Sequence, residues 1–414
     1  MTVLEFFDKS SIDNLITTLS YHADKVIYIG YDEKQLKKEC RLFEKIFSSR
    51  QMGVKIMPIC VPFGNDEKIL QCFIDILQRE RNLIVDLKGG DEVLLFLLGR
   101  AFDIVRPVHT QLHCIDPFSG EIQSHSTSYF FKAENPALNV RETVELHGGI
   151  VVDCTDVSGL GLESGQTHNA LGDLQLMWKI CCQNPNRWNS NTNCLAVIDA
   201  LGIRNGLEVT VSIKEAKRQN KIASYNEAVN ILIPLHRAGL ISMMDVSSSH
   251  ISYVYKNRCV RECLRRAGFL LELKIFMTAL ECRNEDGSPV FQDAMTGAVL
   301  DWDVVSGKNM TVNETDVILM RGMIPYFISC KNGYVHEEEL YKLSTVARKF
   351  GGRHVQKIIV LQMLSGHKEK DMHFLNRAKE MGIQVIFDVY MMDEVDLAED
   401  LAHFDRRNTC DICT

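Results

Sequence analysis

The stretch that most constrains how this chain can fold is a predicted β-hairpin between Asn313 and Asn332. Two short apolar runs, Val317–Met320 and Tyr326–Cys330, have the length and composition of strands. Arg321–Pro325 lies between them and contains a glycine and a proline, the residues typical of turns. The two runs are therefore expected to fold back on each other.

The open end of this hairpin carries a carboxylate and a lysine. Asp316 stands at the start of the first strand, and Ser329 and Lys331 stand near the end of the second. Because side chains alternate along a strand, Ser329 and Lys331 share a face. This arrangement predicts a site for a divalent metal ion and a phosphate. The alternative is a solvated carboxylate beside an exposed lysine.

Length and composition place the chain among ordinary soluble globular proteins. Its 414 residues suffice for two or three domains, and 46% hydrophobic with 24% charged residues is typical of that class. No apolar run reaches the ~18 residues of a membrane helix.

The fourteen cysteines lack framework spacing and follow no signal peptide, so we expect a cytoplasmic protein with reduced thiols. Cys410 and Cys413 have CxxC spacing without a second pair, which argues against a metal site. The net charge of −8 argues against a generally basic nucleic-acid surface and leaves only local patches.

Residues 1–155 are predicted to form a Rossmann-like α/β domain, because apolar runs alternate with amphipathic helical segments. The expected strands are Lys25–Ile29, Lys55–Val61, Asn82–Leu87 and Val108–Ile115, the helices are Glu33–Ser49, Asp66–Gln78 and Glu92–Phe102, and further strands follow at Gly120–Phe131 and Gly148–Asp153. Such a sheet is parallel and binds ligands beyond the carboxyl ends of its strands. The loops at Gly30-Tyr31 and Lys88–Asp91 are therefore expected to face the pocket.

The turn Lys88-Gly89-Gly90-Asp91 admits two interpretations. Its glycines allow close backbone approach, and the following helix offers free N–H groups to a phosphate. The alternative, which the turn taken alone favours, is a tight connection that merely needs positive φ. The segment lacks the third glycine of a dinucleotide fingerprint and the lysine-threonine ending of a P-loop. A classical dehydrogenase or nucleoside triphosphatase is therefore disfavoured.

Residues 166–256 are predicted to form a winged-helix-like segment after a glycine- and serine-rich linker at Asp156–Gly165. The expected helices are Leu171–Cys182, Asn193–Leu201, Ser212–Gln219 and Tyr225–Ala238, and the expected strands are Leu240–Val246 and His250–Tyr255. A basic patch on this segment is a candidate phosphate contact and comprises Lys214, Lys217, Arg218 and Lys221. A winged helix is as often a structural spacer, so both interpretations stay open.

Residues 257–414 are predicted to form an α/β/α domain. The expected elements are a long helix at Arg258–Leu280, a strand at Val299–Val305, the hairpin, a helix at His336–Phe350, a strand at Lys357–Met363, a helix at Asp371–Met381 and a strand at Gln384–Val389. This order is typical of the restriction-endonuclease-like core. Glu272 interrupts the apolar stripe of the long helix, so it is either solvated or turned toward a site.

With these elements in place, the chain resembles CRISPR ancillary nucleases. Those proteins join an N-terminal CARF domain, a Rossmann-like sensor of cyclic oligoadenylates, to a PD-(D/E)XK nuclease domain. The resemblance covers essentially the whole chain, and its motifs are Gly268…Glu272, Asp301-Trp302-Asp303, Asn313-Glu314-Thr315-Asp316, Ile328-Ser329-Cys330-Lys331, Tyr341-Lys342-Leu343…Gly351-Gly352 and the turn Leu87–Asp91. Two positions depart from the family pattern. Lys88 replaces a frequent threonine, and Ser329 stands where the motif has an acid.

The resemblance implies a metal-dependent endonuclease of type III CRISPR antiviral defence, activated by a cyclic oligoadenylate, with cyclic tetra-adenylate as the expected activator. Asp316 would bind Mn²⁺ or Mg²⁺, Glu272 would be an outer ligand or hold the water, and Lys331 would stabilise the transition state. Such ions neutralise the scissile phosphate and activate water. The implied substrate is single-stranded DNA, RNA or plasmid DNA. A two-fold ring ligand also implies a homodimer with Gly89 and Gly90 facing the axis.

The serine at position 329 leaves two questions open. Glu339 is in phase with the apolar stripe of its helix, so it is expected to lean toward the hairpin and supply the missing carboxylate as a metal ligand. The alternative is that the run Glu337–Glu339 complements the helix dipole. If nothing replaces the acid, the chain would instead be a ligand-gated nucleic-acid-binding regulator with a degenerate nuclease core.

Overall fold

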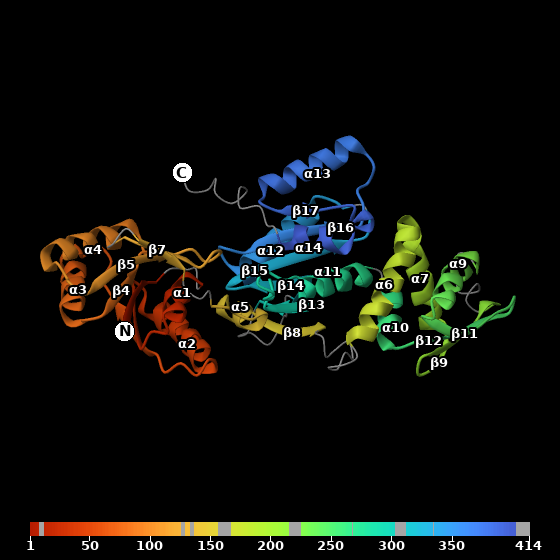
Figure 1. Ribbon diagram of the computed structural model, residues 1–414, viewed down its shortest axis with the longest axis horizontal. Helices are drawn as coiled ribbons and strands as arrows, with labels where there is room; N and C mark the ends of the chain where they lie inside the picture. The colour runs from red at the N-terminus through yellow and green to blue at the C-terminus, as the bar shows by residue number, and fades with distance from the viewer. Residues whose placement is uncertain are drawn as a thin grey trace.

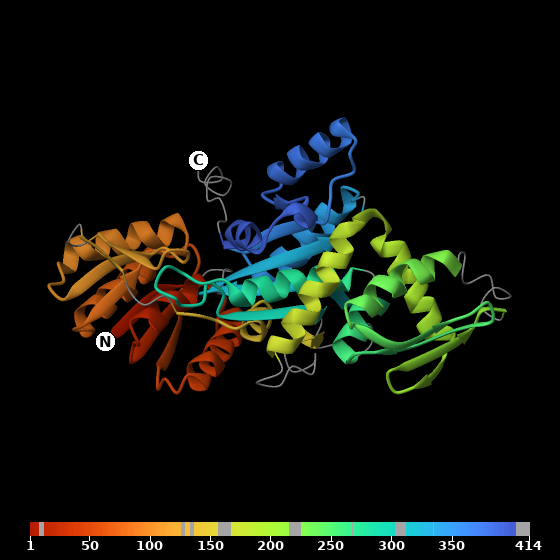
Figure 2. The same cartoon turned by 45° about the vertical axis from the view of Figure 1, so that its right-hand side comes forward.

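The computed structural model describes residues 1–7, 12–125, 129–132, 136–155, 167–214, 225–266, 268–302, 312–333 and 335–402. These residues form a mixed α/β protein with three sheets of seven, four and six strands. The six-stranded sheet, built mostly from the C-terminal part of the chain, lies between the other two (Figures 1 and 2). Within these ranges no helix combines the length and apolarity needed to cross a membrane.

The N-terminal sheet has the order β3-β2-β1-β4-β5-β6-β7. Its strands are β1 (Thr2–Phe6), β2 (Lys25–Gly30), β3 (Lys55–Cys60), β4 (Leu83–Asp86), β5 (Thr110–Ile115), β6 (Glu121–Ser124) and β7 (Tyr129–Lys132). The first five pair in parallel, as predicted, and the last two are antiparallel. Helices α1 (Asp13–Ser20) and α2 (Glu33–Ser49) cover one face, and α3 (Asp66–Arg79) and α4 (Glu92–Val105) cover the other.

Two parts of this sheet differ from expectation. The central strand β1 and helix α1 were not predicted, because Glu5 interrupts the short apolar run Thr2–Phe6. The strand expected at 148–153 is β8 (Ile150–Thr155), which pairs with β13 of the C-terminal sheet and not with the N-terminal sheet. Helix α5 (Val140–Leu146) precedes β8 and packs between α2 and α12. Strand pairing decided this placement, and no local pattern encodes it.

The middle segment contains α6 (Thr167–Gln183), α7 (Pro185–Leu201), α9 (Tyr225–Arg237) and a sheet of order β11-β12-β10-β9. Strands β11 (Ile241–Val246) and β12 (His250–Tyr255) form the expected hairpin, whereas β9 (Ile203–Asn205) and β10 (Glu208–Ser212) were not predicted. The helix expected over 212–219 falls largely outside the described residues, and Ser212 ends β10. Of the proposed basic patch, Lys214 is described and exposed, and the other three residues lie outside the described ranges.

The C-terminal sheet has the order β17-β16-β15-β14-β13-β8. Its further strands are β13 (Asp293–Asp301), β14 (Val312–Arg321), β15 (Ile324–Lys331), β16 (Gln356–Leu361) and β17 (Gln384–Ile386). Helices α11 (Phe269–Glu281) and α14 (Glu394–Ala402) cover one face, and α12 (Glu338–Gly351) and α13 (Lys368–Glu380) cover the other. The predicted hairpin is therefore the β14–β15 pair, in the middle of this sheet.

Two local details of the C-terminal unit correct the sequence analysis. The hairpin turn is shorter than expected: Arg321 pairs with Ile324, and Gly322 takes a φ of +60° as the first of two turn residues. The long helix expected at 258–280 is two helices, α10 (Arg258–Arg265) and α11, broken at Gly268, whose φ is +93°. That conformation is accessible to glycine and ends a right-handed helix.

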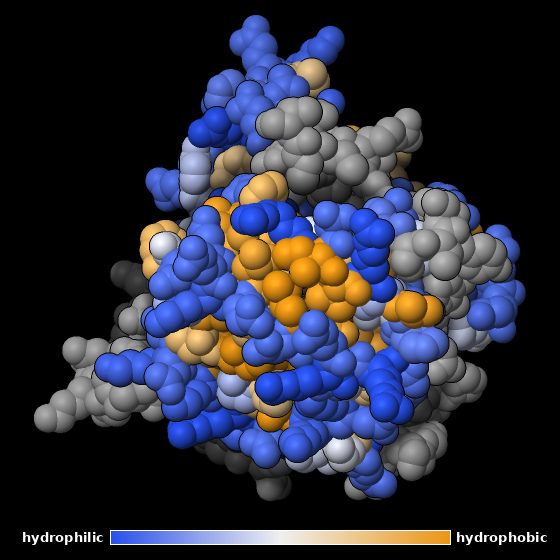
Figure 3. Space-filling model, turned by 90° about the vertical axis from the view of Figure 1, so that its left-hand side faces the viewer, coloured by the Kyte–Doolittle hydropathy of each residue, from blue (hydrophilic) through white to orange (hydrophobic). Residues whose placement is uncertain are grey.

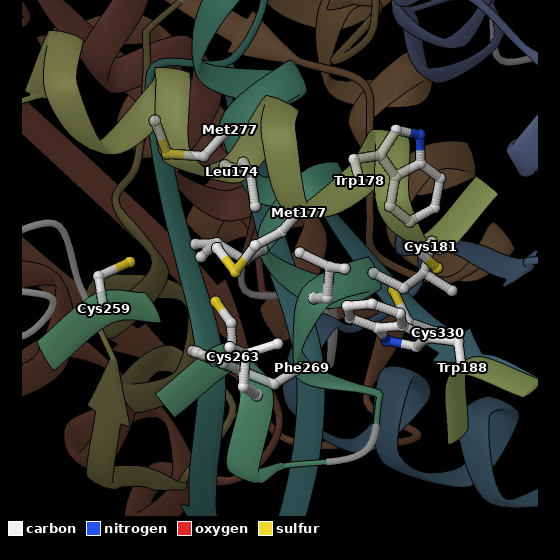
Figure 4. Close-up of a cluster of buried hydrophobic side chains, with 14 of the residues drawn as sticks. Leu174, Met177, Trp178, Cys181, Trp188, Cys259, Cys263, Phe269, Met277 and Cys330 are labelled. Carbon is white, nitrogen blue, oxygen red and sulfur yellow. The ribbon is translucent and has the colours of Figure 1, made fainter. Parts of the chain in front are cut away.

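The middle and C-terminal units share one hydrophobic core. Leu174, Met177, Trp178 and Cys181 of α6 and Trp188 of α7 pack against Cys259, Cys263, Phe269, Met277 and Cys330 from α10, α11 and β15 (Figure 4). Every cysteine in the described ranges is free, and Cys410 and Cys413 lie outside those ranges. A second core joins α1 and α2 of the N-terminal unit to α5, α12 and the C-terminal sheet. The C-terminal unit is thus fixed from both sides.

Candidate active site

The open end of the hairpin brings together the residues singled out there. The printed ladder between β14 and β15 ends at Val317 and Ile328, so Asp316 and Ser329 come next. The Oδ2 atom of Asp316 accepts a hydrogen bond of 2.7 Å from the backbone N–H of Cys330 and one of 3.2 Å from the Ser329 hydroxyl. The Nζ atom of Lys331 lies 3.7 Å from the same oxygen. The Asp316 carboxylate thus terminates the ladder and faces the lysine.

Lys331 bridges two carboxylates from different elements. Its Nζ atom lies 3.3 Å from Oε2 of Glu339 in addition to its contact with Asp316. Burial alone would lower the pKa of Lys331, but the two carboxylates outweigh burial and hold its pKa above the usual value. The lysine is therefore a fixed positive charge at the end of the hairpin.

Glu339 leans toward the hairpin, as its helical phase indicated, whereas Glu338 is exposed and Glu337 pairs with His373 at 2.7 Å. The other carboxylate oxygen of Glu339 lies 2.6 Å from Nζ of Lys342, one turn along α12. Burial opposes its ionisation, but the two lysines together lower its pKa below the usual value. Glu339 therefore stands at the site as a carboxylate held between two ammonium groups.

Glu272 reaches the site from the opposite side of the sheet. The break at Gly268 starts α11 at Phe269, which puts Glu272 in the first turn. A Cβ atom added to Gly268 would lie 3.6 Å from Oε1 of Glu272, so the carboxyl folds back over the glycine. Burial, followed by the negative charge of Asp316, raises the pKa of Glu272 to about 8. Glu272 and Asp316 therefore interact unfavourably when both are ionised.

The side chains at the hairpin end determine whether a divalent metal ion fits there. Among the described residues, no three His, Cys, Asp or Glu side chains are grouped closely enough to hold a metal ion by themselves. Asp316 and Glu272 are nevertheless the pair whose repulsion a cation would relieve, and Lys331 only partly offsets it. Hard divalent ions such as Mg²⁺ take one or two carboxylates and complete their shell with water and phosphate oxygens. The carboxylates of Asp316 and Glu272 therefore fit such an ion. The carboxylate of Glu339 is instead paired with Lys331 and Lys342.

A cavity of about 500 Å³ opens beside this site, between the N-termini of α12 and α13. Leu361 lies on its floor and is in register with Lys331 on the neighbouring strand. The rim includes Glu337, Glu338 and His373. The carboxyl ends of the parallel strands β15 and β16 thus form a hollow next to the candidate active site, where α/β sheets commonly bind ligands.

The predicted sensor residues meet at the carboxyl ends of β2 and β4. Gly89 and Gly90 have φ of +82° and +75°, and a Cβ atom on Gly90 would lie 2.9 Å from Cβ of Phe6. Asp91 caps α4 by accepting from the N–H of Leu94 at 2.8 Å, and it also accepts from the Tyr31 hydroxyl at 3.2 Å. Gly30 packs against Phe7, where an added Cβ would lie 3.2 Å away. Backbone geometry alone therefore requires both turn glycines.

Buried carboxylates beneath this turn were not singled out from the sequence. Glu5 of β1 and Asp86 of β4 are fully buried. Asp86 accepts from the N–H of Lys88 at 2.7 Å and from the hydroxyl of Thr17, and Glu5 accepts from Thr18 at 3.3 Å. Burial is the main reason why the pKa of Asp86 rises to about 6 and why the pKa of Glu5 is raised well above its usual value. The available signal was an acidic residue inside each short apolar run.

In addition to the shared core, a polar contact joins helix α1 to the C-terminal unit. The Nε2 atom of His354, in the loop after α12, lies 2.9 Å from both carboxylate oxygens of Asp13 in α1. Phe118 packs edge-on against the His354 ring, with 6.0 Å between centroids. Helix α1 therefore contacts both Asp86, beneath the sensor turn, and the loop that ends α12, the helix that carries Glu339.

The chain resembles known proteins in its fold rather than in its sequence. No protein-family model matches the chain, and no curated protein matches it significantly. Among solved structures, protein VC1899 from Vibrio cholerae superposes with a TM-score of 0.72 and 18% identity, covering 97% of each chain. Can2 from Sulfobacillus thermosulfidooxidans, solved in complex with cyclic tetra-adenylate, superposes with a TM-score of 0.64 and 14% identity, covering 97% of this chain and 98% of that one. The whole chain therefore shares its fold with both proteins.

Proposed function

We propose that this protein is a metal-dependent endonuclease that a cyclic oligoadenylate switches on. The observation that carries the proposal is the convergence of Asp316, Lys331 and Glu272 at one end of the hairpin, from three separate elements. Full-length likeness to a protein solved with cyclic tetra-adenylate supports the sensing part. The resemblance of the motifs to CRISPR ancillary nucleases supports the hydrolytic part and a role in antiviral defence.

In this proposal each residue acts on phosphodiester hydrolysis in a defined way. Asp316 and Glu272 would hold a Mn²⁺ or Mg²⁺ ion, which supplies charge neutralisation at the phosphate and an activated water. Lys331 places its ammonium group where negative charge develops in the transition state. The Ser329 hydroxyl donates to Asp316 and so orients that carboxylate. Glu339 fixes Lys331 from the other side and is a further candidate ligand.

The proposed activator site is the turn Lys88–Asp91 with Gly30 and Tyr31, in two copies at a homodimer axis. An exposed apolar surface on the adjacent side of the N-terminal unit supports self-association. Figure 3 shows this side of the molecule, with hydrophobic residues clustered on it. Around α3 and α4 the exposed apolar side chains are Phe63 (83% exposed), Val93, Phe96 (65%), Ile104 and Val108 (87%). Patches of this kind mark interaction surfaces, and a C₂ dimer would bury two copies against each other.

The second candidate function is a ligand-gated nucleic-acid-binding regulator. The observation that favours it is the ladder-ending role of Asp316, whose Oδ2 atom already accepts from Cys330 and Ser329. With serine at position 329, the second strand of the hairpin offers no carboxylate at the position where the nuclease motif has an acid. Under this alternative the polar hairpin end would be structural.

One experiment separates the two functions. The protein is incubated with plasmid DNA, single-stranded DNA and single-stranded RNA in Mn²⁺, with and without cyclic tetra-adenylate. The nuclease proposal expects cleavage of at least one substrate that depends on both metal and activator. Intact nucleic acid under every condition, together with measurable binding, would select the regulator.

A further inference from the structure

The break between α10 and α11 places one arginine beside the candidate active site. The N–H of Arg266 ends α10 by donating to the carbonyl of Glu262 at 3.2 Å, and the carbonyl of Arg266 accepts from the N–H of Phe269 at 3.2 Å. Two backbone hydrogen bonds therefore fix Arg266 at the break itself. The unbroken helix expected from the sequence would not have displayed this residue at a helix end.

The side chain of Arg266 is held by one buried ring and one exposed acid. Its guanidinium carbon lies 4.5 Å from the ring centroid of Phe269, which is buried in the core shared by α6, α10 and α11 (Figure 4). Its Nη2 atom lies 3.7 Å from Oε1 of Glu314. The side chains of Arg266 and Glu314 are 41% and 60% exposed. The ring thus supports one face of the guanidinium, while the ion pair stays open to solvent.

Glu314 connects Arg266 to the β14–β15 hairpin that carries the candidate active site. It lies two residues before Asp316 on β14, so the two side chains share a face and stand roughly 7 Å apart along the strand. The positive charge of Arg266 also acts on Glu272. The other arginines at this end of α10 are committed elsewhere, because Arg261 and Arg265 pair with the buried Asp199 at 3.0 and 3.3 Å.

We propose that Arg266 is a second phosphate-binding cation of the nuclease site, with Glu314 occupying its guanidinium until nucleic acid arrives. The inference rests on the proposed nuclease function and names the residue that would bind a phosphate next to the scissile one. An ion pair as exposed as this one contributes little net free energy, so it exchanges readily for another partner. A phosphate offers the same planar fork two charge-assisted hydrogen bonds, which arginine is shaped to make.

The test measures binding without chemistry. A fluorescent single-stranded oligonucleotide is titrated with full-length protein in EDTA over a salt series, for wild type, Arg266→Gln, Glu314→Gln and the matched control Arg258→Gln. Arg258 is an exposed arginine at the other end of α10. We expect several-fold weaker binding for Arg266→Gln, with a salt slope shallower by about 0.7, the value for one lost phosphate contact on a single strand. Arg258→Gln should bind like wild type.

Variants of Glu314 distinguish a specific exchange of Arg266 from Glu314 to phosphate from a general effect of net charge on binding. Glu314→Gln should tighten binding a few-fold, and this gain should vanish in Arg266→Gln/Glu314→Gln if it acts through the arginine. An additive gain in the double variant, or wild-type binding and slope for Arg266→Gln, would overturn the inference. Thermal unfolding confirms that each variant is folded. Wild-type protein that binds but never cleaves would refute the nuclease function while leaving this binding result readable.

Discussion

Replacing Glu272 by glutamine should stabilise the metal-free protein in alkaline solution. The pKa of this carboxyl rises from 4.5 to about 8 in the folded protein, mainly through burial and then through Asp316. At about 1.4 kcal/mol per pH unit, keeping Glu272 ionised in the fold costs on the order of 5 kcal/mol, as an upper value. Glutamine has nearly the same shape and carries no charge, so it removes this cost.

The direction of this pH dependence of stability follows from how many protons the folded and unfolded states bind. Between pH 4.5 and about 8 the folded protein keeps the proton on Glu272 while the unfolded chain releases it, so the free energy of unfolding falls as pH rises through this window. Above about pH 8 both states are ionised and the loss is complete. Wild type and Glu272→Gln should therefore have similar stabilities at pH 4.5. At pH 9 the variant should be more stable by a few kcal/mol.

The assay is chemical denaturation in EDTA at pH 4.5 and pH 9, with Glu338→Gln as the control. Glu338 is exposed in the first turn of α12, so its loss removes only a favourable dipole interaction of ~0.3–1 kcal/mol. When EDTA is replaced by saturating Mn²⁺, wild type should become the more stable of the two proteins at pH 9, because only wild type offers the second carboxylate. Equal pH dependence of wild type and Glu272→Gln would refute the argument that burial beside Asp316 controls this group.

Three further changes test the site and the assembly. Lys331→Met should lower cleavage by about 10²–10³-fold, the usual cost of one transition-state donor, without altering activator binding measured by calorimetry; retained cleavage would remove Lys331 from the mechanism. Glu339→Gln should reduce activity and Mn²⁺ affinity strongly and Glu338→Gln only slightly, because Glu339, unlike Glu338, contacts Lys331; equal mild effects would leave the dipole role standing. Phe96→Glu, in the exposed apolar patch around α4, should convert the proposed dimer to monomers in light scattering, and an unchanged dimer mass would place the interface elsewhere.

The sequence by itself determined the hairpin and which polar residues gather at its open end. Strand alternation and a glycine turn act over neighbouring residues, so Asp316, Ser329 and Lys331 could be brought to one end without knowing the rest of the fold. The helical phase of α12 likewise placed Glu339 toward the hairpin and Glu338 toward solvent. The alternation of strands and helices gave the parallel core of the N-terminal sheet for the same reason.

Only the tertiary structure decided which distant segments meet. β8 joins the C-terminal sheet because β13 offers it an edge, and β1 becomes a central strand because β2 and β4 flank it, although Glu5 weakens its apolar pattern. The positive φ of Gly268 divides a continuous helical pattern and so sets Glu272 against Asp316. Apolar periodicity reports which face of an element is buried, and it carries no information on the partner that buries it. The close approach of charged side chains from separate elements, and the pKa shifts that this approach causes, therefore depend on the tertiary structure.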